Sequence, residues 1–97
     1  MFAVIVYDIP TDERGKKRYQ KIHKLCQKNG YAVNGSVFEF DMDYTEFLKL
    51  IHDIEKVIDI NADSVRIYVI GRQRTEQNTR LLGKREIIEV DNIVSVW

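Results

Sequence analysis

The chain has 97 residues, of which 44% are hydrophobic and 31% charged, as in an ordinary globular protein. This length predicts one domain over 1–97 with a single modest core. No apolar run approaches the roughly 20 residues that cross a bilayer, and no basic region precedes the first apolar stretch, so we expect no membrane association and no signal peptide. Cys26 is the single cysteine, which excludes an intrachain disulfide and a cysteine-rich zinc site. We therefore expect a cytoplasmic protein.

The formal net charge is zero, but the charges are unevenly distributed along the chain. Residues 1–30 hold seven Lys or Arg against three Asp or Glu; residues 31–63 hold two against eight, and residues 64–97 hold six against four. Local fields govern the approach of a charged partner more than the total charge does. The zero balance therefore does not exclude nucleic-acid binding.

The first predicted element is an apolar strand that ends on an acid, Phe2-Ala3-Val4-Ile5-Val6-Tyr7-Asp8. Pro10 has no amide hydrogen and closes the strand. Asp8 is therefore expected at the solvent-exposed exit of a stiff element, which is a suitable place for a metal ligand. The alternative is that Asp8 caps the turn or helix that follows, and the residues alone do not decide between the two interpretations.

A basic helix is predicted next, with a cap and acids in Thr11-Asp12-Glu13 and an end at Asn29-Gly30. Its apolar positions recur at helical spacing: Tyr19, Ile22, Leu25 and Cys26. A spacing of four, three and four residues places four lysines on one face: Lys17, Lys21, Lys24 and Lys28. This face is either a stripe that follows phosphates or a solvated helix surface.

Strand composition returns between residues 31 and 40, where Gly35 predicts a bulge, a close backbone approach or a break into two strands. Asp43 and Glu46 resemble a capping box at the start of a second amphipathic helix. The apolar stripe of that helix is Phe47, Leu48, Ile51, Ile54 and Ile58.

The remainder of the chain predicts strands and an arginine-rich segment. Residues 65–70 alternate as a strand does, and residues 72–80 are polar, with three arginines that can follow a nucleic-acid backbone without reading bases. Residues 79–82 predict a short further strand, and residues 93–97 predict a last apolar strand.

With a break near Gly35, these elements run strand, helix, strand, strand, helix, strand, which predicts an α+β, ferredoxin-like βαββαβ fold. Such a sheet carries both helices on one face, and the other face must be covered, solvated or bound by a partner. Tyr7, Phe38 and Tyr68 are candidates for that open face; Tyr7 and Phe38 either stack on bases there or belong to the core. The C-terminal strand, about 92–97, has no place in a four-stranded sheet, so we expect it to pair across a homodimer interface.

Several segments together resemble the CRISPR-associated protein 2 family, the small nuclease-like partner of the CRISPR spacer integrase. They are Val6-Tyr7-Asp8 with Ile9-Pro10, then Ser36-Val37-Phe38-Glu39, then Asp63-Ser64-Val65-Arg66-Ile67-Tyr68, and finally the 86–91 stretch before the apolar tail. These segments occur along the chain in the order and at the separations that the family shows. The chain departs from the common pattern at Asn34-Gly35, where the family more often has Gln and a larger residue.

The resemblance implies a ferredoxin-like homodimer in which a divalent metal, Mg²⁺ or another such as Mn²⁺, lies between two strand-end aspartates. The family's metal aspartate falls on Asp8, and its Ser-x-Phe falls on Ser36 and Phe38. Arg14 is a further candidate beside the scissile phosphate, because an arginine can bind a phosphate through two hydrogen bonds. The candidate nucleic-acid contacts are Lys17, Arg18, Lys21, Arg72 and Arg74.

The function implied by the resemblance is CRISPR adaptation in the prokaryotic cytoplasm, as part of antiviral defence. The implied activity is metal-dependent endonuclease or endoribonuclease cleavage of phosphodiester bonds. The implied partners are the spacer integrase and DNA or RNA. The first alternative is a non-catalytic scaffold that bridges DNA for the integrase. The second is a toxin-like ribonuclease of the virulence-associated family, and the most distant is a ligand-binding ferredoxin-like regulator.

Overall fold

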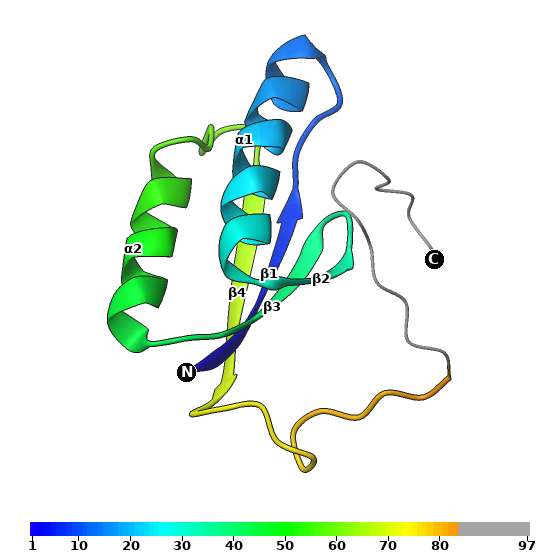
Figure 1. Cartoon of the computed structure of the whole chain (residues 1–97). Coiled ribbons are helices and arrows are strands. Elements are labelled where there is room, and N and C mark those ends of the chain that lie inside the picture. Colours follow the sequence, from blue (N-terminus) through cyan, green and yellow to red (C-terminus); the bar gives the residue numbers. More distant parts are fainter. Residues whose placement is uncertain (84–97) are drawn as a thin grey trace.

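The six elements follow one another in the predicted order, with a helix after the first strand and another after the third (Figure 1). The structure is a computed structural model and describes residues 1–83. The elements are β1 (Phe2–Asp8), α1 (Glu13–Asn29), β2 (Tyr31–Asn34), β3 (Val37–Asp41), α2 (Tyr44–Glu55) and β4 (Ser64–Gly71).

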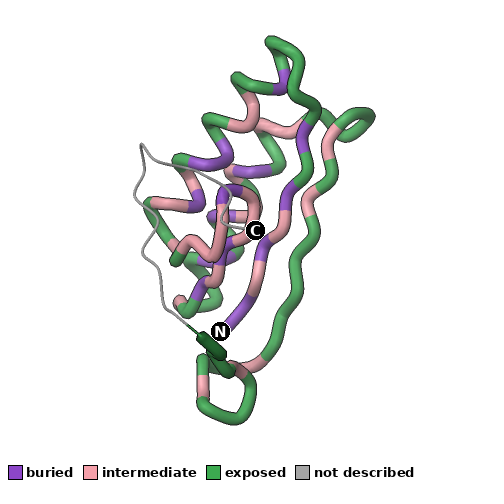
Figure 2. The backbone as a smooth tube through the Cα atoms, turned by 90° about the vertical axis from the view of Figure 1, so that its right-hand side faces the viewer, coloured by how far each residue is buried: buried purple, intermediate pink, exposed green. Residues whose placement is uncertain are grey.

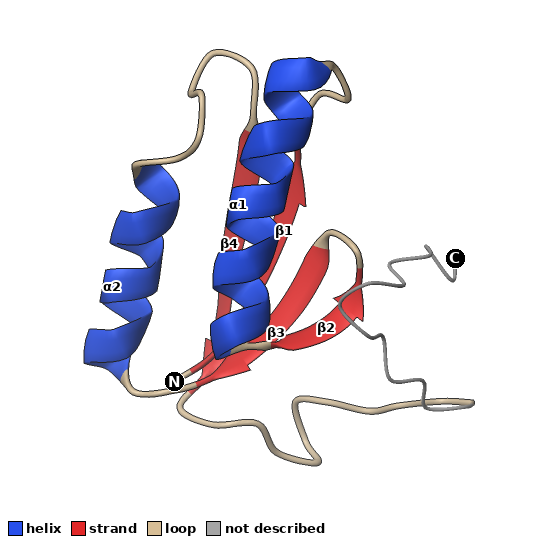
Figure 3. Ribbon diagram, turned by 45° about the horizontal axis from the view of Figure 1, so that its top comes forward, coloured by secondary structure: helices blue, strands red, loops and turns tan. Residues whose placement is uncertain are grey.

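The strands form one antiparallel sheet in the order β2-β3-β1-β4, and both helices lie on the same face of it (Figure 3). This arrangement confirms the α+β, ferredoxin-like prediction for four strands and two helices. The predicted C-terminal strand at about 92–97 and the family-like stretch at 86–91 lie outside the described residues. Among residues 1–83, neither helix has the length and apolar character to cross a membrane.

The predicted break near Gly35 is a turn between β2 and β3. The Asn34 side chain accepts a hydrogen bond from the Ser36 amide through Oδ1 at 2.8 Å, which closes the turn locally. The pairing of β2 with β3 is irregular between Ala32 and Asn34. The Gly35 position therefore separates two short strands.

Helix α1 begins at a cap and requires a glycine in its first turn. Asp12 accepts a hydrogen bond from the Gly15 amide at 2.7 Å, so Asp12, and not Asp8, caps the helix. A Cβ atom at Gly15 would lie 1.8 Å from the Pro10 carbonyl oxygen. The loop between β1 and α1 can therefore fold back this closely only because residue 15 has no side chain.

Helix α2 differs in two respects from the prediction. Asp43 occupies the N-cap position but its side chain makes no capping hydrogen bond, so the predicted capping box does not form. The buried residues of the helix are Phe47, Leu50 and Ile54. Leu48 is 49% exposed, because it lies about 100° around the helix from Phe47 and points away from the sheet.

The core lies between the sheet and the helices, and it receives every second residue of β1. Ala3, Ile5 and Tyr7 are buried there, as Figure 2 shows for the alternating β1 trace. Phe38 pairs with Ile5 in the register and is fully buried on the same face. Of the two alternatives for Tyr7 and Phe38, the structure therefore supports the core and excludes the open face.

The open face is formed by the other residues of the alternation. Tyr68 pairs with Val4 on that face and is half exposed, as expected. The short strand predicted at residues 79–82 does not form, because the chain after β4 continues as a loop with a turn closed by a 3.0 Å hydrogen bond from the Thr79 amide to the Thr75 carbonyl. Its Arg74 forms an ion pair with Glu39 of β3 at 3.2 Å.

Candidate metal and nucleic-acid site

Asp8 is the last residue of β1 and is exposed. Because side chains alternate along a strand, Asp8 projects to the face opposite its buried neighbour Tyr7. Within residues 1–83 its carboxylate has no hydrogen-bond or ion-pair partner. A rigidly placed and unpaired carboxylate of this kind offers hard oxygen atoms to a divalent cation.

The other strands bring two serines to the same end of the sheet. Ser64 is the first residue of β4 and pairs directly with Asp8. The Ser36 carbonyl accepts a hydrogen bond from the Tyr7 amide at 3.0 Å, which holds the β2–β3 turn against the end of β1. Arg14 lies exposed in the first turn of α1, which follows β1 after a short loop.

Phe38 does not belong to this constellation, because its ring is buried at 0% exposure under the helices. Any part it takes in function is through packing. Among the described residues no group of three or more His, Cys, Asp or Glu side chains is placed to hold a metal ion. Within residues 1–83, Asp8 is therefore the carboxylate that we assign to the predicted metal site, without a ready-made cluster of ligands around it.

A hydrogen-bonded aromatic cluster lies beneath the same end of the sheet. The Tyr7 hydroxyl donates to the Gly35 carbonyl at 2.8 Å and lies 2.7 Å from His23 Nδ1, and Tyr19 also donates to Gly35. Since the single Tyr7 proton goes to Gly35, we assign the His23 proton to Nδ1, which donates to Tyr7. His23 Nε2 is then a buried acceptor without a partner among the described residues.

Burial determines the ionisation of this cluster. Burial raises the pKa of Tyr7, and the neighbouring Cys26 and Tyr19 raise it further. It lowers the pKa of His23, and the nearby Gly35 backbone acts in the opposite direction. Burial also raises the pKa of the Cys26 thiol to about 12. All of these groups are uncharged at neutral pH, so the cluster serves packing rather than acid–base chemistry.

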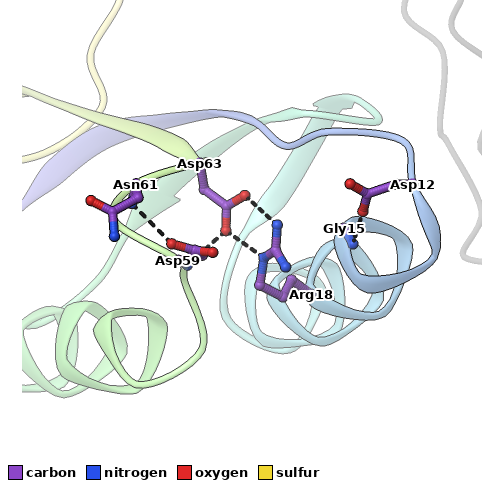
Figure 4. Close-up of polar contacts among 6 residues, drawn as sticks. All are labelled: Asp12, Gly15, Arg18, Asp59, Asn61 and Asp63. Carbon is purple, nitrogen blue, oxygen red and sulfur yellow. Dashed lines mark hydrogen bonds and ion pairs between the residues drawn. The ribbon is translucent and has the colours of Figure 1, made fainter.

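An ion pair joins α1 to the loop that precedes β4 (Figure 4). Arg18 binds Asp63 with two hydrogen bonds, from Nε at 2.7 Å and from Nη2 at 2.9 Å. The Asp63 carboxylate also accepts from the Asp59 amide at 2.8 Å, and Asp59 accepts from the Asn61 amide at 2.9 Å. Since Asp63 directly precedes Ser64, this network fixes the start of β4 beside Asp8.

The Arg18 guanidinium holds the pKa of the Asp63 carboxyl below its usual range, and the Asp63 carboxylate raises the pKa of Arg18. The Asp63 side chain has no exposed surface, and that of Arg18 has 18%. Arg18 is therefore engaged within the protein, and its charge is largely balanced before any phosphate approaches.

The remaining candidate nucleic-acid contacts are on the surface. Lys17 and Lys21 are exposed on α1, and Arg72 is exposed at the start of the loop after β4. Arg74 is half exposed but is held on β3 by Glu39, and its amide donates to Asp41. The described structure thus leaves Lys17, Lys21 and Arg72 without an ion-pair partner within residues 1–83.

Sequence reasoning missed the pairing of Arg18 with Asp63, because the two residues are 45 positions apart. The sequence also gives no sign that Lys56 lies beside three lysines of α1. No local pattern in the sequence could reveal either arrangement, since both depend on how α1 lies against the second half of the chain.

The strand order and the single helix layer define a ferredoxin-like α+β protein with an acid at the exit of its first strand. A family model described as "CRISPR associated protein Cas2" matches residues 1–78. The chain therefore belongs to the Cas2 family of CRISPR-associated proteins.

Individual relatives agree with this assignment. The CRISPR-associated endoribonuclease Cas2 1 of Moorella thermoacetica is 41% identical over 69 residues, covering 70% of this chain and 72% of the relative. The CRISPR-associated endonuclease Cas2 of Halalkalibacterium halodurans is 40% identical over 72 residues, covering 73% and 75%. The crystal structure of Streptococcus pyogenes Cas2 superposes with a TM-score of 0.73 at 33% identity and covers 86% of this chain and all of that chain.

Proposed function

We propose that this chain is a metal-dependent nuclease that cleaves phosphodiester bonds as a homodimer, with Asp8 of each protomer binding one shared divalent cation. The observation that carries the proposal is the exposed, unpaired Asp8 carboxylate at the end of a central strand. The Moorella and Halalkalibacterium relatives, named as an endoribonuclease and an endonuclease, support the reaction class.

The donor set fits Mg²⁺ or Mn²⁺ if two protomers contribute. Mg²⁺ is commonly bound by one or two carboxylates and keeps several waters, so two Asp8 side chains suffice as protein ligands. When bound, the cation would polarise a phosphate oxygen and lower the pKa of a bound water. The chain's part is to hold Asp8 in place, through the pairing of β1 with Ser64 and through the Arg18–Asp63 ion pair.

The outer edge of β4 supports a dimer. Within residues 1–83, β4 pairs with β1 on one side only, which leaves its other backbone groups unpaired. Figure 2 shows β4 exposed along most of its length. Its exposed large apolar residues are Ile67, Tyr68, Val69 and Ile70. A long apolar edge strand of this kind tends to pair with another chain.

Nucleic acid, either DNA or RNA, would approach along α1. Lys17 and Lys21 are exposed there, and Arg14 lies in the first turn of the same helix. Arg72 is exposed just after β4, at the end of the sheet opposite Asp8, and would be a separate contact. Such contacts bind phosphates and carry no base specificity. Arg18 and Arg74 are bound to acidic side chains of the same chain, so we assign them to positioning rather than to phosphate contact.

Family membership supports a place in CRISPR adaptation. We therefore assign the spacer integrase as the protein partner, in the cytoplasm of a prokaryote and in antiviral defence. The second candidate function is a scaffold that bridges DNA for the integrase without cleaving it. It is favoured by the single carboxylate that residues 1–83 bring to the site.

The experiment is a cleavage assay with Mg²⁺ or Mn²⁺ on single-stranded RNA and on duplex DNA. We expect Asp8→Asn to abolish divalent-dependent cleavage while circular dichroism and sedimentation remain those of the parent, because Asn keeps the size but not the charge. The matched control is Glu46→Gln, an exposed acid on α2, which should cleave normally.

Cleavage by Asp8→Asn at the parental rate would overturn the metal assignment. A parent protein that binds duplex DNA but cleaves neither substrate with either metal would overturn the nuclease proposal in favour of the scaffold.

A further inference from the structure

A shallow groove runs between α1 and α2 on the outer side of the helix layer. The two helices lie side by side in Figures 1 and 3, with the C-terminal end of α2 against α1. The residues that line the groove are Lys21, Lys24, Leu25, Lys28, Asp53, Lys56 and Val57. The groove therefore combines lysines from two helices with an apolar floor.

The groove is strongly cationic, with four lysines against Asp53. Among residues 1–83, none of these five side chains takes part in an ion pair. The lysines of α1 follow one another at spacings of three and four, where like charges destabilise a helix. Apart from Lys28, whose charge favours the C-terminal end of α1, these lysines have no charge partner among residues 1–83 and are available to an anionic partner.

The floor of the groove is apolar. Leu25 and Val57 are partly buried, pack against the core and present their remaining surface between the lysines. Apolar surface is buried favourably by an apolar side chain, whereas a phosphate gains nothing from it. A ligand that matches the groove must therefore carry acidic groups around an apolar one.

We propose that this groove docks an acidic peptide segment of a partner protein, with an apolar side chain seated on Leu25 and Val57 and flanking carboxylates on the lysines. Nucleic acid is the less suitable occupant, because phosphates would leave the apolar floor of Leu25 and Val57 unused. The proposal does not depend on the proposed nuclease function. The groove is on the helix layer, whereas Asp8 projects to the opposite face of the sheet, so a cation at Asp8 and a peptide in the groove can be bound together. Lys21 is common to the groove and to the proposed nucleic-acid surface on α1.

The probe is a synthetic peptide in which glutamates flank two adjacent leucines, titrated into the ¹⁵N-labelled full chain. We expect amide shifts at Lys24, Leu25, Lys28 and at the C-terminal end of α2. Replacing both peptide leucines by serine should weaken binding, because the apolar floor loses its partner.

The matching variant of the protein is Lys24→Glu with Lys28→Glu, and the control is Lys49→Glu, an exposed lysine of α2 outside the groove. The double variant should lose affinity for the peptide about tenfold, because each reversal removes an attraction and adds a repulsion. Lys56→Glu is the second variant, so that the result does not depend on the folding of one protein, and the amide spectrum verifies the fold of each.

Three results would overturn the proposal. The first is an absence of shifts in the groove at millimolar peptide. The second is equal binding of the serine peptide, which would leave only a general attraction between charges. The third is displacement of the peptide by duplex DNA together with an equal loss of DNA affinity in Lys24→Glu/Lys28→Glu and in Lys17→Glu, which would make the groove part of the phosphate-binding surface.

Discussion

Tyr7 and Asp8 are neighbours in β1, yet they belong to two different regions of the molecule. Tyr7 points under the helices, where its hydroxyl is bound by Gly35 and His23. Asp8 points to the other face, where its carboxylate has no partner within residues 1–83. The alternation of a strand thus separates a side chain that stabilises the fold from one that remains available to a ligand.

The two regions differ in whether their side chains and backbone groups already have partners within the described structure. On the covered face, most polar atoms are paired and the rings pack both stacked and edge to face. The edge-to-face pairs include Tyr7 with Tyr19, 5.6 Å apart between ring centroids, and His23 with Phe38 at 5.3 Å. On the open side, β4 is unpaired along one edge of the described sheet. Substitutions on the covered face should therefore change stability, and substitutions on the open face should change binding or catalysis.

The largest effect is expected from Phe38→Ala compared with Val37→Ala, two adjacent residues of β3. Phe38 is fully buried, so its truncation should lower the free energy of unfolding by about 3–5 kcal/mol. Val37 lies half buried on the open face, so its truncation to Ala should lower the free energy of unfolding clearly less. Urea unfolding of both variants checks this, and equal losses would mean that the open face is also part of a packed core.

A second comparison, of Tyr7→Phe with Asp8→Asn, should show a smaller difference in the free energy of unfolding, with Tyr7→Phe the more destabilising change. Removal of the hydroxyl leaves His23 Nδ1 buried without a partner and should cost about 1–3 kcal/mol. Asp8 has no partner within residues 1–83, so Asp8→Asn should change stability by no more than about 0.5 kcal/mol. Chemical denaturation measures both, and a destabilised Asp8→Asn protein would show that Asp8 has a structural role.

The smallest effect is the pH dependence that His23 confers. Burial lowers the pKa of His23 below its ordinary 6.5, so the unfolded chain binds this proton more readily than the folded chain does. Its contribution to stability is therefore complete above about pH 6.5 and decreases as the pH falls toward the folded-state pKa.

Unfolding measured between neutral pH and about pH 5 should show this loss in the parent and a flatter profile in His23→Gln. The control is His52→Gln, which removes the exposed histidine of α2 and leaves the buried one in place. An unchanged profile in His23→Gln would assign the pH dependence to other groups.

Much of the fold could be predicted from the sequence because its signals are local. The apolar run that ends at Asp8, the cap at Asp12 and the break at Gly35 each depend on a few neighbouring residues. The direction in which a strand residue points could not be predicted as well, since Tyr7 and Phe38 were candidates for either face. Their burial follows from the register between β1 and β3, which is a long-range property.

The candidate site shows the same limit. Asp8 stands out in the sequence because it ends an apolar strand, and its exposure agrees with that expectation. The partner of Arg18 does not stand out, because Asp63 comes from a turn 45 residues further along the chain. The groove lysines likewise come from two helices and meet only in the folded protein.

The central claim is that the free carboxylate on the open side of β1 binds a divalent cation shared by two protomers. The most direct measurement is the stoichiometry of Mn²⁺ binding by the full-length protein, followed by electron paramagnetic resonance. We predict one Mn²⁺ for every two chains, and loss of that binding in Asp8→Asn with the dimer intact. One Mn²⁺ per chain, or undiminished binding by Asp8→Asn, would contradict it.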